Sequence, residues 1–144
     1  MPDYHSSLGV SPLDVSSSAL SAHRVRMNVI ANNLANVNTT RNDKGFHEIY
    51  RRKEVVFKTG DPVGVRSERY GVRVREVLPD KSPLRLEYQP DHPDADRNGY
   101  VEMPNVRVPL EMIDMIEASR SYEANITAIQ VTRAMNRTSL ELLS

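Results

Sequence analysis

The chain has 144 residues, of which 39% are hydrophobic and 26% are charged, a size that suits one ordinary domain. Nineteen Lys and Arg residues balance nineteen Asp and Glu residues, and a zero net charge argues against a dedicated nucleic-acid binder or a polybasic membrane-surface protein. The chain has no cysteine, which excludes disulfides, thiolate zinc sites and iron–sulfur clusters. It has no apolar run of about 18 residues and no basic and apolar leader, so we expect neither a membrane span nor a cleaved signal.

Proline and glycine divide the chain into three parts. Residues 13–44 and 110–144 contain neither, whereas residues 45–109 contain seven of the nine prolines and five of the six glycines. Because these residues interrupt regular structure, this distribution predicts a long helix at each end and strands with turns between them.

Residues 13–37 carry apolar side chains in a seven-residue repeat, which predicts a helix with a coiled-coil-like seam. Two rows form the seam, and six of their eight positions are apolar. The seam residues that we expect at helix interfaces are Leu20, Met27, Ile30, Leu34 and Val37.

The other faces of this first helix carry mostly small, uncharged side chains. Only Asp14, Arg24 and Arg26 are charged between residues 13 and 40, although a solvent-facing helix normally carries more charge. Small and amide side chains allow close approach of other segments, and Asn is a mediocre helix former. We therefore expect packing on several sides, with a soluble helix of a monomeric bundle as the alternative.

Four short strands are expected in the middle of the chain, at residues 50–57, 72–78, 84–88 and 100–103. Apolar and charged residues alternate cleanly in the third of them, which is typical of a half-buried strand. In the second, the alternation changes phase near Glu76. This change indicates a β-bulge.

Pro109 suits the first position of a second long helix, whose apolar spacing continues to Leu143. Glu111, Asp114 and Glu117 lie near its start, where the helix dipole favours acids. The helix carries two apolar stripes; one would satisfy a helical hairpin, whereas two require neighbours on two sides. The stripe residues that we expect at interfaces are Met112, Met115, Ile116, Tyr122, Ile126, Ile129, Met135 and Leu140.

These elements predict an α+β fold in which the N- and C-terminal helices pair as an antiparallel or near-parallel-axis coiled coil and a small β-rich middle domain protrudes. The expected boundaries are 1–12 for an extended N-terminal segment, 13–40 and 110–144 for one discontinuous helical domain, and 41–109 for the middle domain. A slender helix pair cannot bury both stripes of each helix, so we expect homo- or hetero-assembly.

Residues 94–99 match the first six positions of a calcium loop. Such a loop also needs a bidentate glutamate at its twelfth position, where this chain has Asn105, and prolines flank it in place of helices. We therefore favour a tight turn whose carboxylates accept hydrogen bonds from backbone amides, with calcium binding as the alternative.

Patterns typical of catalysis or cofactor binding are missing from the sequence. The four histidines lack metal-ligand spacing, and His23 falls on the helix seam, where a packing role is expected. The run 51–53 is basic, and we expect a solvated strand face or a salt-bridged contact from it rather than nucleic-acid binding. There is no nucleophile elbow, P-loop or dinucleotide motif. We expect no enzyme activity, no metal site and no cofactor.

Residues 31–40, ANNLANVNTT, resemble the N-terminal signature of bacterial flagellar rod and hook axial proteins, whose core is A-N-N-L-A-N-x-N-T. The segments 50–53, 92–101 and 112–124 are more selective and together resemble proximal-rod members of this family. The residues that carry the family motifs are Asn32, Asn33, Leu34, Ala35, Asn36, Asn38, Thr39, Asp94, Asp96, Asn98, Gly99 and Tyr100.

The resemblance implies a structural subunit of the flagellar basal-body proximal rod, located in the periplasm and exported by the flagellar type III apparatus without signal cleavage. It implies helical assembly with itself and other axial proteins into a hollow drive shaft that transmits torque and encloses the export channel. The implied neighbours are other proximal-rod proteins, the distal rod and a rod–ring junction protein. We expect neither nucleic-acid binding nor direct insertion into a membrane.

A binding module is the alternative hypothesis from another class, for example a helical-hairpin adaptor or a secretion chaperone, monomeric or dimeric. Such a module would fold well alone and have a melting temperature that does not depend on concentration. A sedimentation series would separate it from an assembly subunit.

Overall fold

The computed structural model describes residues 12–41, 45–59 and 71–142, and the predicted N-terminal segment lies outside them except for Pro12. The described elements, in chain order, are α1 (Pro12–Ala35), β1 (Lys53–Thr59), β2 (Val72–Pro79), β3 (Arg85–Tyr88), β4 (Tyr100–Met103) and α2 (Val108–Glu141). The strands form two separate antiparallel hairpins, β1–β2 and β3–β4. The predicted α+β fold with a helix at each end is confirmed.

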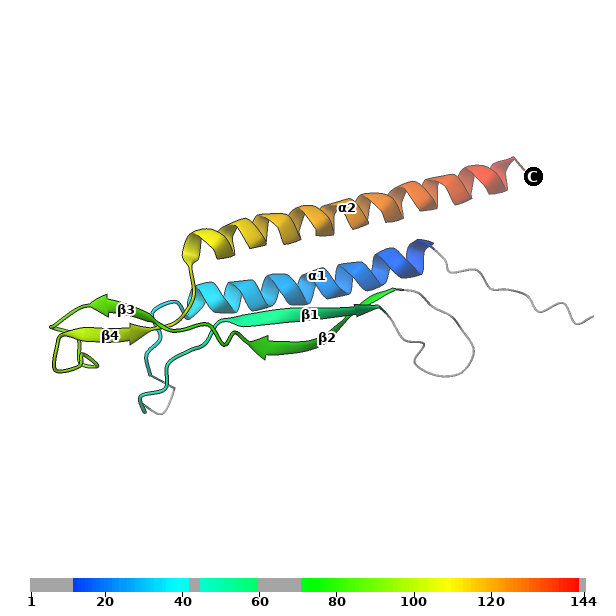
Figure 1. Ribbon diagram of the computed structural model, residues 1–144. Helices are drawn as coiled ribbons and strands as arrows, with labels where there is room; N and C mark the ends of the chain where they lie inside the picture. Colours follow the sequence, from blue (N-terminus) through cyan, green and yellow to red (C-terminus); the bar gives the residue numbers. More distant parts are fainter. Residues whose placement is uncertain (1–11, 42–44, 60–70, 143–144) are drawn as a thin grey trace, which may run out of the picture.

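The helices lie side by side and antiparallel, and α1 forms the middle layer of the molecule (Figure 1). α2 covers one side of α1, and the β1–β2 hairpin lies along another side. The expected packing of α1 on several sides is therefore confirmed. The expectation that the whole middle region protrudes is wrong, because β1 and β2 lie against α1, whereas the β3–β4 hairpin extends beyond the helix pair (Figure 1).

The β1–β2 hairpin contains the bulge that the sequence predicts. Val56 pairs with Glu76 and Phe57 with Val74, so Arg75 is the extra residue on β2. β1 begins at Lys53 rather than at the expected Tyr50, because the preceding residues make other bonds: the Tyr50 amide donates to the Thr39 carbonyl at 3.1 Å.

The core is small and lies where α1 ends and α2 begins. Its buried apolar residues are Ala22, Val29, Ile30, Val101, Met103, Val106 and Ala118. Four polar residues are buried with them, namely Asn33, Thr40, Asn105 and Glu111. A core with so high a polar share depends on complete hydrogen bonding.

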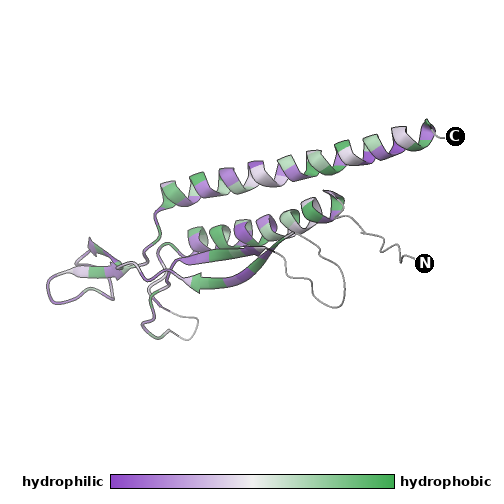
Figure 2. Ribbon diagram, turned by 45° about the vertical axis from the view of Figure 1, so that its right-hand side comes forward, coloured by the Kyte–Doolittle hydropathy of each residue, from purple (hydrophilic) through white to green (hydrophobic). Residues whose placement is uncertain are grey.

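The other end of α2 has a different environment. The helix continues past the start of α1 (Figure 1), and its residues 133–142 are all exposed. Figure 2 shows hydrophobic residues along the length of α2, including this uncovered part. Within the described part of the chain, no helix is both long and apolar enough to cross a membrane.

Candidate assembly interface

Asn33 stands at the centre of the buried polar junction between the two helices and β1. Its Nδ2 donates to the Lys53 carbonyl at 2.9 Å and to Glu111 Oε2 at 3.0 Å. Its Oδ1 accepts from the Lys53 amide and from the Tyr50 hydroxyl, both at 2.9 Å. These four bonds use the full capacity of an amide side chain, so neither Asp nor Leu could replace Asn33 without leaving a buried group unpaired.

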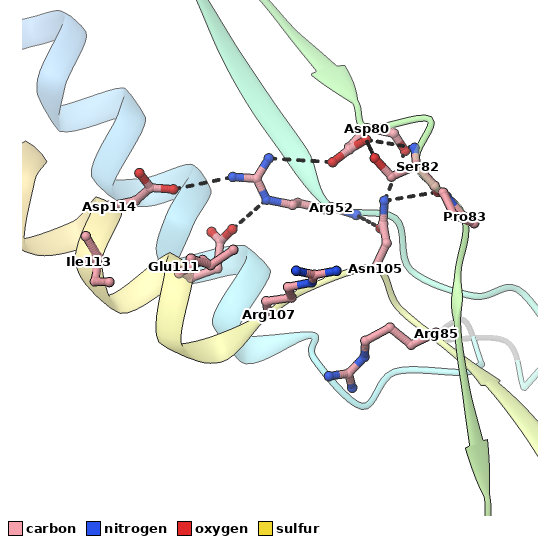
Figure 3. A pocket seen from close by; sticks show the side chains of 11 residues that line it. Arg52, Asp80, Ser82, Pro83, Arg85, Asn105, Arg107, Glu111, Ile113 and Asp114 are labelled. Carbon is pink, nitrogen blue, oxygen red and sulfur yellow. Dashed lines mark hydrogen bonds and ion pairs between the residues drawn. The ribbon is translucent and has the colours of Figure 1, made fainter.

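Arg52 joins the same junction from the segment that leads into β1 (Figure 3). Its Nε donates to Glu111 Oε1 at 2.6 Å, and its terminal nitrogens lie 3.4 Å from Asp114 and 3.7 Å from Asp80. Another terminal bond reaches Glu54. Partial burial opposes the charged form of Arg52, but the hydrogen bond and charge of Glu111, with Glu54 next, outweigh this and raise its pKa.

Glu111 is the fully buried acid of this junction. Arg52 and Asn33, its partners, belong to two other segments, so the junction ties α1, α2 and the start of β1 together. An isolated buried carboxylate would be very costly, and its two partners make this burial possible. Burial, followed by the negative charge of Glu111, raises the pKa of the Tyr50 hydroxyl. That hydroxyl therefore remains a proton donor to Asn33.

A pocket of about 540 Å³ opens beside this junction, between the start of α2 and the start of β3 (Figure 3). Asn105 forms part of its wall: its Oδ1 accepts from the Arg52 amide at 2.8 Å, and its Nδ2 donates to the Asp80 carbonyl at 3.3 Å. Asp80 accepts from the Ser82 hydroxyl and amide, which lowers its pKa. Asn105, Asp80 and Ser82 are thus bonded within the chain and hold its segments together.

The motif 31–40 ends α1 and anchors the loop after it. Asn36 donates from Nδ2 to the Asn32 carbonyl at 2.8 Å, and the Thr39 hydroxyl donates to Asn36 Oδ1 at 3.2 Å. The next two residues reach a distant turn, because the Thr40 hydroxyl donates to Asp94 at 2.8 Å and the Arg41 Nε donates to Asp94 at 2.9 Å. Arg41 first, and then Thr40, lower the pKa of Asp94 to about 2.

The turn after Asp94 has the structure favoured for it. Asp96 Oδ1 accepts from the amides of Asn98 and Tyr100, both at 2.8 Å. Gly99 has a φ of +81°, a conformation that favours glycine. The interpretation as a turn with carboxylate–amide bonds is confirmed. Asp94 binds Arg41 and Thr40, and in the described residues no cluster of three or more potential metal ligands is found.

His23 has a packing role, as the sequence predicts. Its ring meets that of Phe57 on β1 edge-on, with centroids 6.0 Å apart. Burial, and then the charge of Arg26, lower its pKa. His23 therefore helps to seat the β1–β2 hairpin on α1.

The predicted interface residues fall into three groups by exposure. Ile30 is buried. Eight are half-buried, namely Leu20, Met27, Leu34, Val37, Met115, Tyr122, Ile126 and Ile129. Four on α2 are exposed, namely Met112, Ile116, Met135 and Leu140. One face of α2 thus packs within the chain, and large apolar residues remain on its open faces.

Two models of known families match the chain. One, described as flagella basal body rod protein, matches residues 13–41, and the other, described as flagellar basal body rod FlgEFG protein C-terminal, matches residues 97–142. The flagellar basal-body rod protein FlgC of Borreliella burgdorferi is 44% identical over 92% of this chain and 96% of its own length. That of Bacillus subtilis is 41% identical over 90% and 95%.

The chain belongs to the FlgC family of flagellar basal-body rod proteins. It is a structural subunit of the proximal rod, as the resemblance implies. The matched regions of the chain contain α1 with its motif and β4 with α2. Asn33 and Glu111 come from different matched regions, so the junction joins the two parts of the chain that the family models describe.

Sequence reasoning found Asn33 but missed its partners. Glu111 was predicted only to complement the helix dipole, and Tyr50 and Asn105 were given no role. The basic run 51–53 was expected to form a solvated face or a salt-bridged contact, and the second holds for Arg52. The signal that could have found the Arg52–Glu111 pair was an acid at the start of a helix together with an arginine in a segment predicted to be a strand. Only the fold could bring the two together.

Proposed function

We propose that this FlgC-family chain builds the rod through the uncovered faces of its terminal helices. The observation that supports this most is the row of large apolar residues left on α2: Ile113, Ile116, Val131 and Met135 each expose more than half of their surface. Patches of this kind mark contact sites on soluble proteins. Covering them with neighbouring subunits would supply the hydrophobic free energy that assembly needs.

The finer features of the proposal come from the sequence. α1 and α2 pair as a coiled coil in the rod, and the predicted interface residues meet helices of neighbouring subunits there. The neighbours are further copies and other axial proteins, including the distal rod and a rod–ring junction protein. The chain reaches the periplasm by the flagellar type III route, encloses the export channel and has no enzyme activity. Cysteine-free composition suits passage between reducing and oxidising compartments.

The test is a pair of substitutions at Met135, which is 65% exposed and lies in the exposed stretch 133–142. Met135→Asp places a carboxylate in the proposed interface, whereas Met135→Leu keeps an apolar side chain of similar volume. We expect both variants to have the circular dichroism of the wild type. Met135→Asp should be absent from purified basal bodies and non-motile, and Met135→Leu should be incorporated.

The outcomes separate folding from assembly. If Met135→Asp is incorporated and motile at the wild-type level, the uncovered face of α2 is not an interface and the proposal fails. Loss of incorporation by both variants would also count against it, because a conservative apolar change should preserve the contact.

A further inference from the structure

The β3–β4 hairpin and the turn between its strands form one stiff unit, which we call the arm (residues 85–103). The two strands are paired along their whole length, and the rings of Tyr88 and Tyr100 meet edge-on across them, with centroids 5.3 Å apart. Inside the turn, Asp96 Oδ1 accepts from two backbone amides at 2.8 Å. The strands and the turn should therefore move as one body.

The arm stands apart from the other elements. β3 and β4 lie beside each other and beside no other described helix or strand, and the hairpin extends beyond the helix pair (Figure 1). Two buried side chains of β4, Val101 and Met103, give the arm an apolar seat, but apolar contacts are not directional. A fixed angle between the arm and the helix pair therefore needs directional bonds.

Asn105 provides such bonds at the base of the arm. Its Nδ2 donates to the carbonyls of Asp80 and Ser82 at 3.3 and 3.4 Å, and its Oδ1 accepts from the Arg52 amide at 2.8 Å. These bonds join the segments that enter and leave the arm to the segment that leads into β1 (Figure 3). A body held near one point can still swing about that point, so the base alone does not set the angle of the arm.

Asp94 provides a second attachment, in the turn of the arm. Its side chain is 4% exposed, and its carboxylate accepts from the Thr40 hydroxyl at 2.8 Å and from the Nε and Nη2 of Arg41 at 2.9 and 2.5 Å. The Asp94 amide donates to His92 Nδ1 at 3.1 Å, which ties the backbone at Asp94 to the turn. We call Thr40, Arg41 and Asp94 the Asp94 clamp, and it connects the turn to the loop that follows α1.

We propose that the Asp94 clamp sets the angle of the arm on the helix pair and that the arm swings about its base when the clamp is opened. Charge-assisted bonds to a carboxylate are strong, and the fork of an arginine gives them a defined direction. The clamp and the base are separate points of attachment, and two points fix an orientation that one point leaves free. An arm at one angle can meet its surroundings in the same way in every copy of the chain, whereas a swinging arm cannot.

The test measures the distance between the arm and α1 in the full-length chain by pulsed electron spin resonance. The chain has no cysteine, so spin labels can be attached through Asn28→Cys on α1 and Asn98→Cys in the turn, both at exposed positions. The doubly labelled chain should give one narrow distance distribution. Adding Asp94→Ala, which removes every bond of the clamp, should broaden the distribution several-fold while the helical circular dichroism stays unchanged.

Two further variants show whether the clamp itself is responsible. Asp91→Ala is the matched control, because Asp91 is an exposed acid of the same turn that lies outside the clamp; its distribution should stay narrow. Arg41→Gln removes the ion pair but leaves the Thr40 bond, so it should broaden the distribution less than Asp94→Ala. The Arg41 side chain is 48% exposed, so the fold should tolerate this change even if Asp94→Ala does not fold.

The proposal is overturned if Arg41→Gln and every folded Asp94→Ala chain keep the narrow distribution, or if the labelled chain without further changes already gives a broad one. Equal broadening by Asp91→Ala would also overturn it, because any change in the turn would then loosen the arm. These distances are measured without rod assembly, so a failure of the proposed function would leave the result of this test unchanged.

Discussion

The two ends of the helix pair differ in how their polar and apolar groups are satisfied. Where α1 ends and α2 begins, Asn33, Arg52 and Glu111 are bonded to one another inside the chain. At the other end, residues 133–142 are all exposed within the described part of the chain, and Leu140 in α2 and Leu142 just after it expose 69% and 82% of their surface. The first end is completed by the chain itself, whereas we propose that a neighbouring subunit covers the second.

The difference shows how one helix can serve both folding and assembly. A buried ion pair contributes little net stability over an apolar contact but is costly to break, so it fixes which segments meet. An exposed apolar stripe contributes nothing until another surface covers it. Substitutions at the first end, or at a link beside it, should therefore change the stability of the chain, whereas substitutions at the second end should change assembly.

The largest effect is expected at Glu111. Replacing it with Ala leaves the Arg52 guanidinium and the Asn33 amide without their shared partner, and breaking such a pair costs roughly 3–5 kcal/mol. Urea unfolding followed by circular dichroism should show this loss. Glu111→Gln, which still accepts a hydrogen bond from Asn33, should lose less. Wild-type stability in the Ala variant would mean that the junction does not hold this end.

Ala118 offers a test of helix packing next to the junction. It is fully buried between the helices, and Ala118→Leu adds volume that a close-packed contact cannot take up. We expect a loss of roughly 1–3 kcal/mol in the free energy of unfolding. The control is Ala124→Leu on the exposed face of the same helix, which should unfold like the wild type. Equal losses in the two would indicate that α1 does not pack on this face.

The link between the α1 loop and the turn predicts a dependence on pH. Asp94 has a pKa of about 2, below its usual value of 3.8, because Arg41 and then Thr40 bind its ionised form. A group with a lowered pKa adds stability above its ordinary pKa, and this stability is lost as the pH falls from about 4 to about 2. Unfolding measured across this range should show a component that is missing in Asp94→Asn. Identical pH profiles of unfolding for the wild type and Asp94→Asn would contradict this prediction.

The smallest effect is expected at the far end of α2. Arg137 and Glu141 form an i,i+4 pair at 2.9 Å with side chains that are 83% and 62% exposed. Exposed pairs of this kind contribute about 0.3–0.5 kcal/mol. Arg137→Gln should therefore leave urea unfolding almost unchanged, and a loss as large as that of Glu111→Ala would show that this end is also held within the chain.

The sequence predicts the elements well because each rests on a local pattern. The seven-residue rows, the N1 proline and the phase change at Glu76 give both helices and the bulge close to their positions. The seating of β1–β2 on α1 could not be predicted, because it depends on contacts such as His23 with Phe57 that lie far apart in the chain.

The residues of the candidate site also divide into those that a local sequence pattern predicts and those that no local pattern marks. The apolar stripes are periodic, so their residues could be named in advance, and Asn33 stood in a recognisable motif. Glu111, Tyr50 and Asn105 have no periodicity that marks them. Their role arises only when three segments meet, and an acid near a helix start already has a local explanation in the helix dipole.

Amide hydrogen exchange along α2 tests the contrast between the two ends most directly. In the isolated chain, residues 111–122 should be protected by α1 and the junction, whereas residues 133–142 should exchange rapidly. In purified rods, residues 133–142 should become protected as well. Strong protection of residues 133–142 in a verified monomer, or rapid exchange of these residues in the rod, would contradict the account.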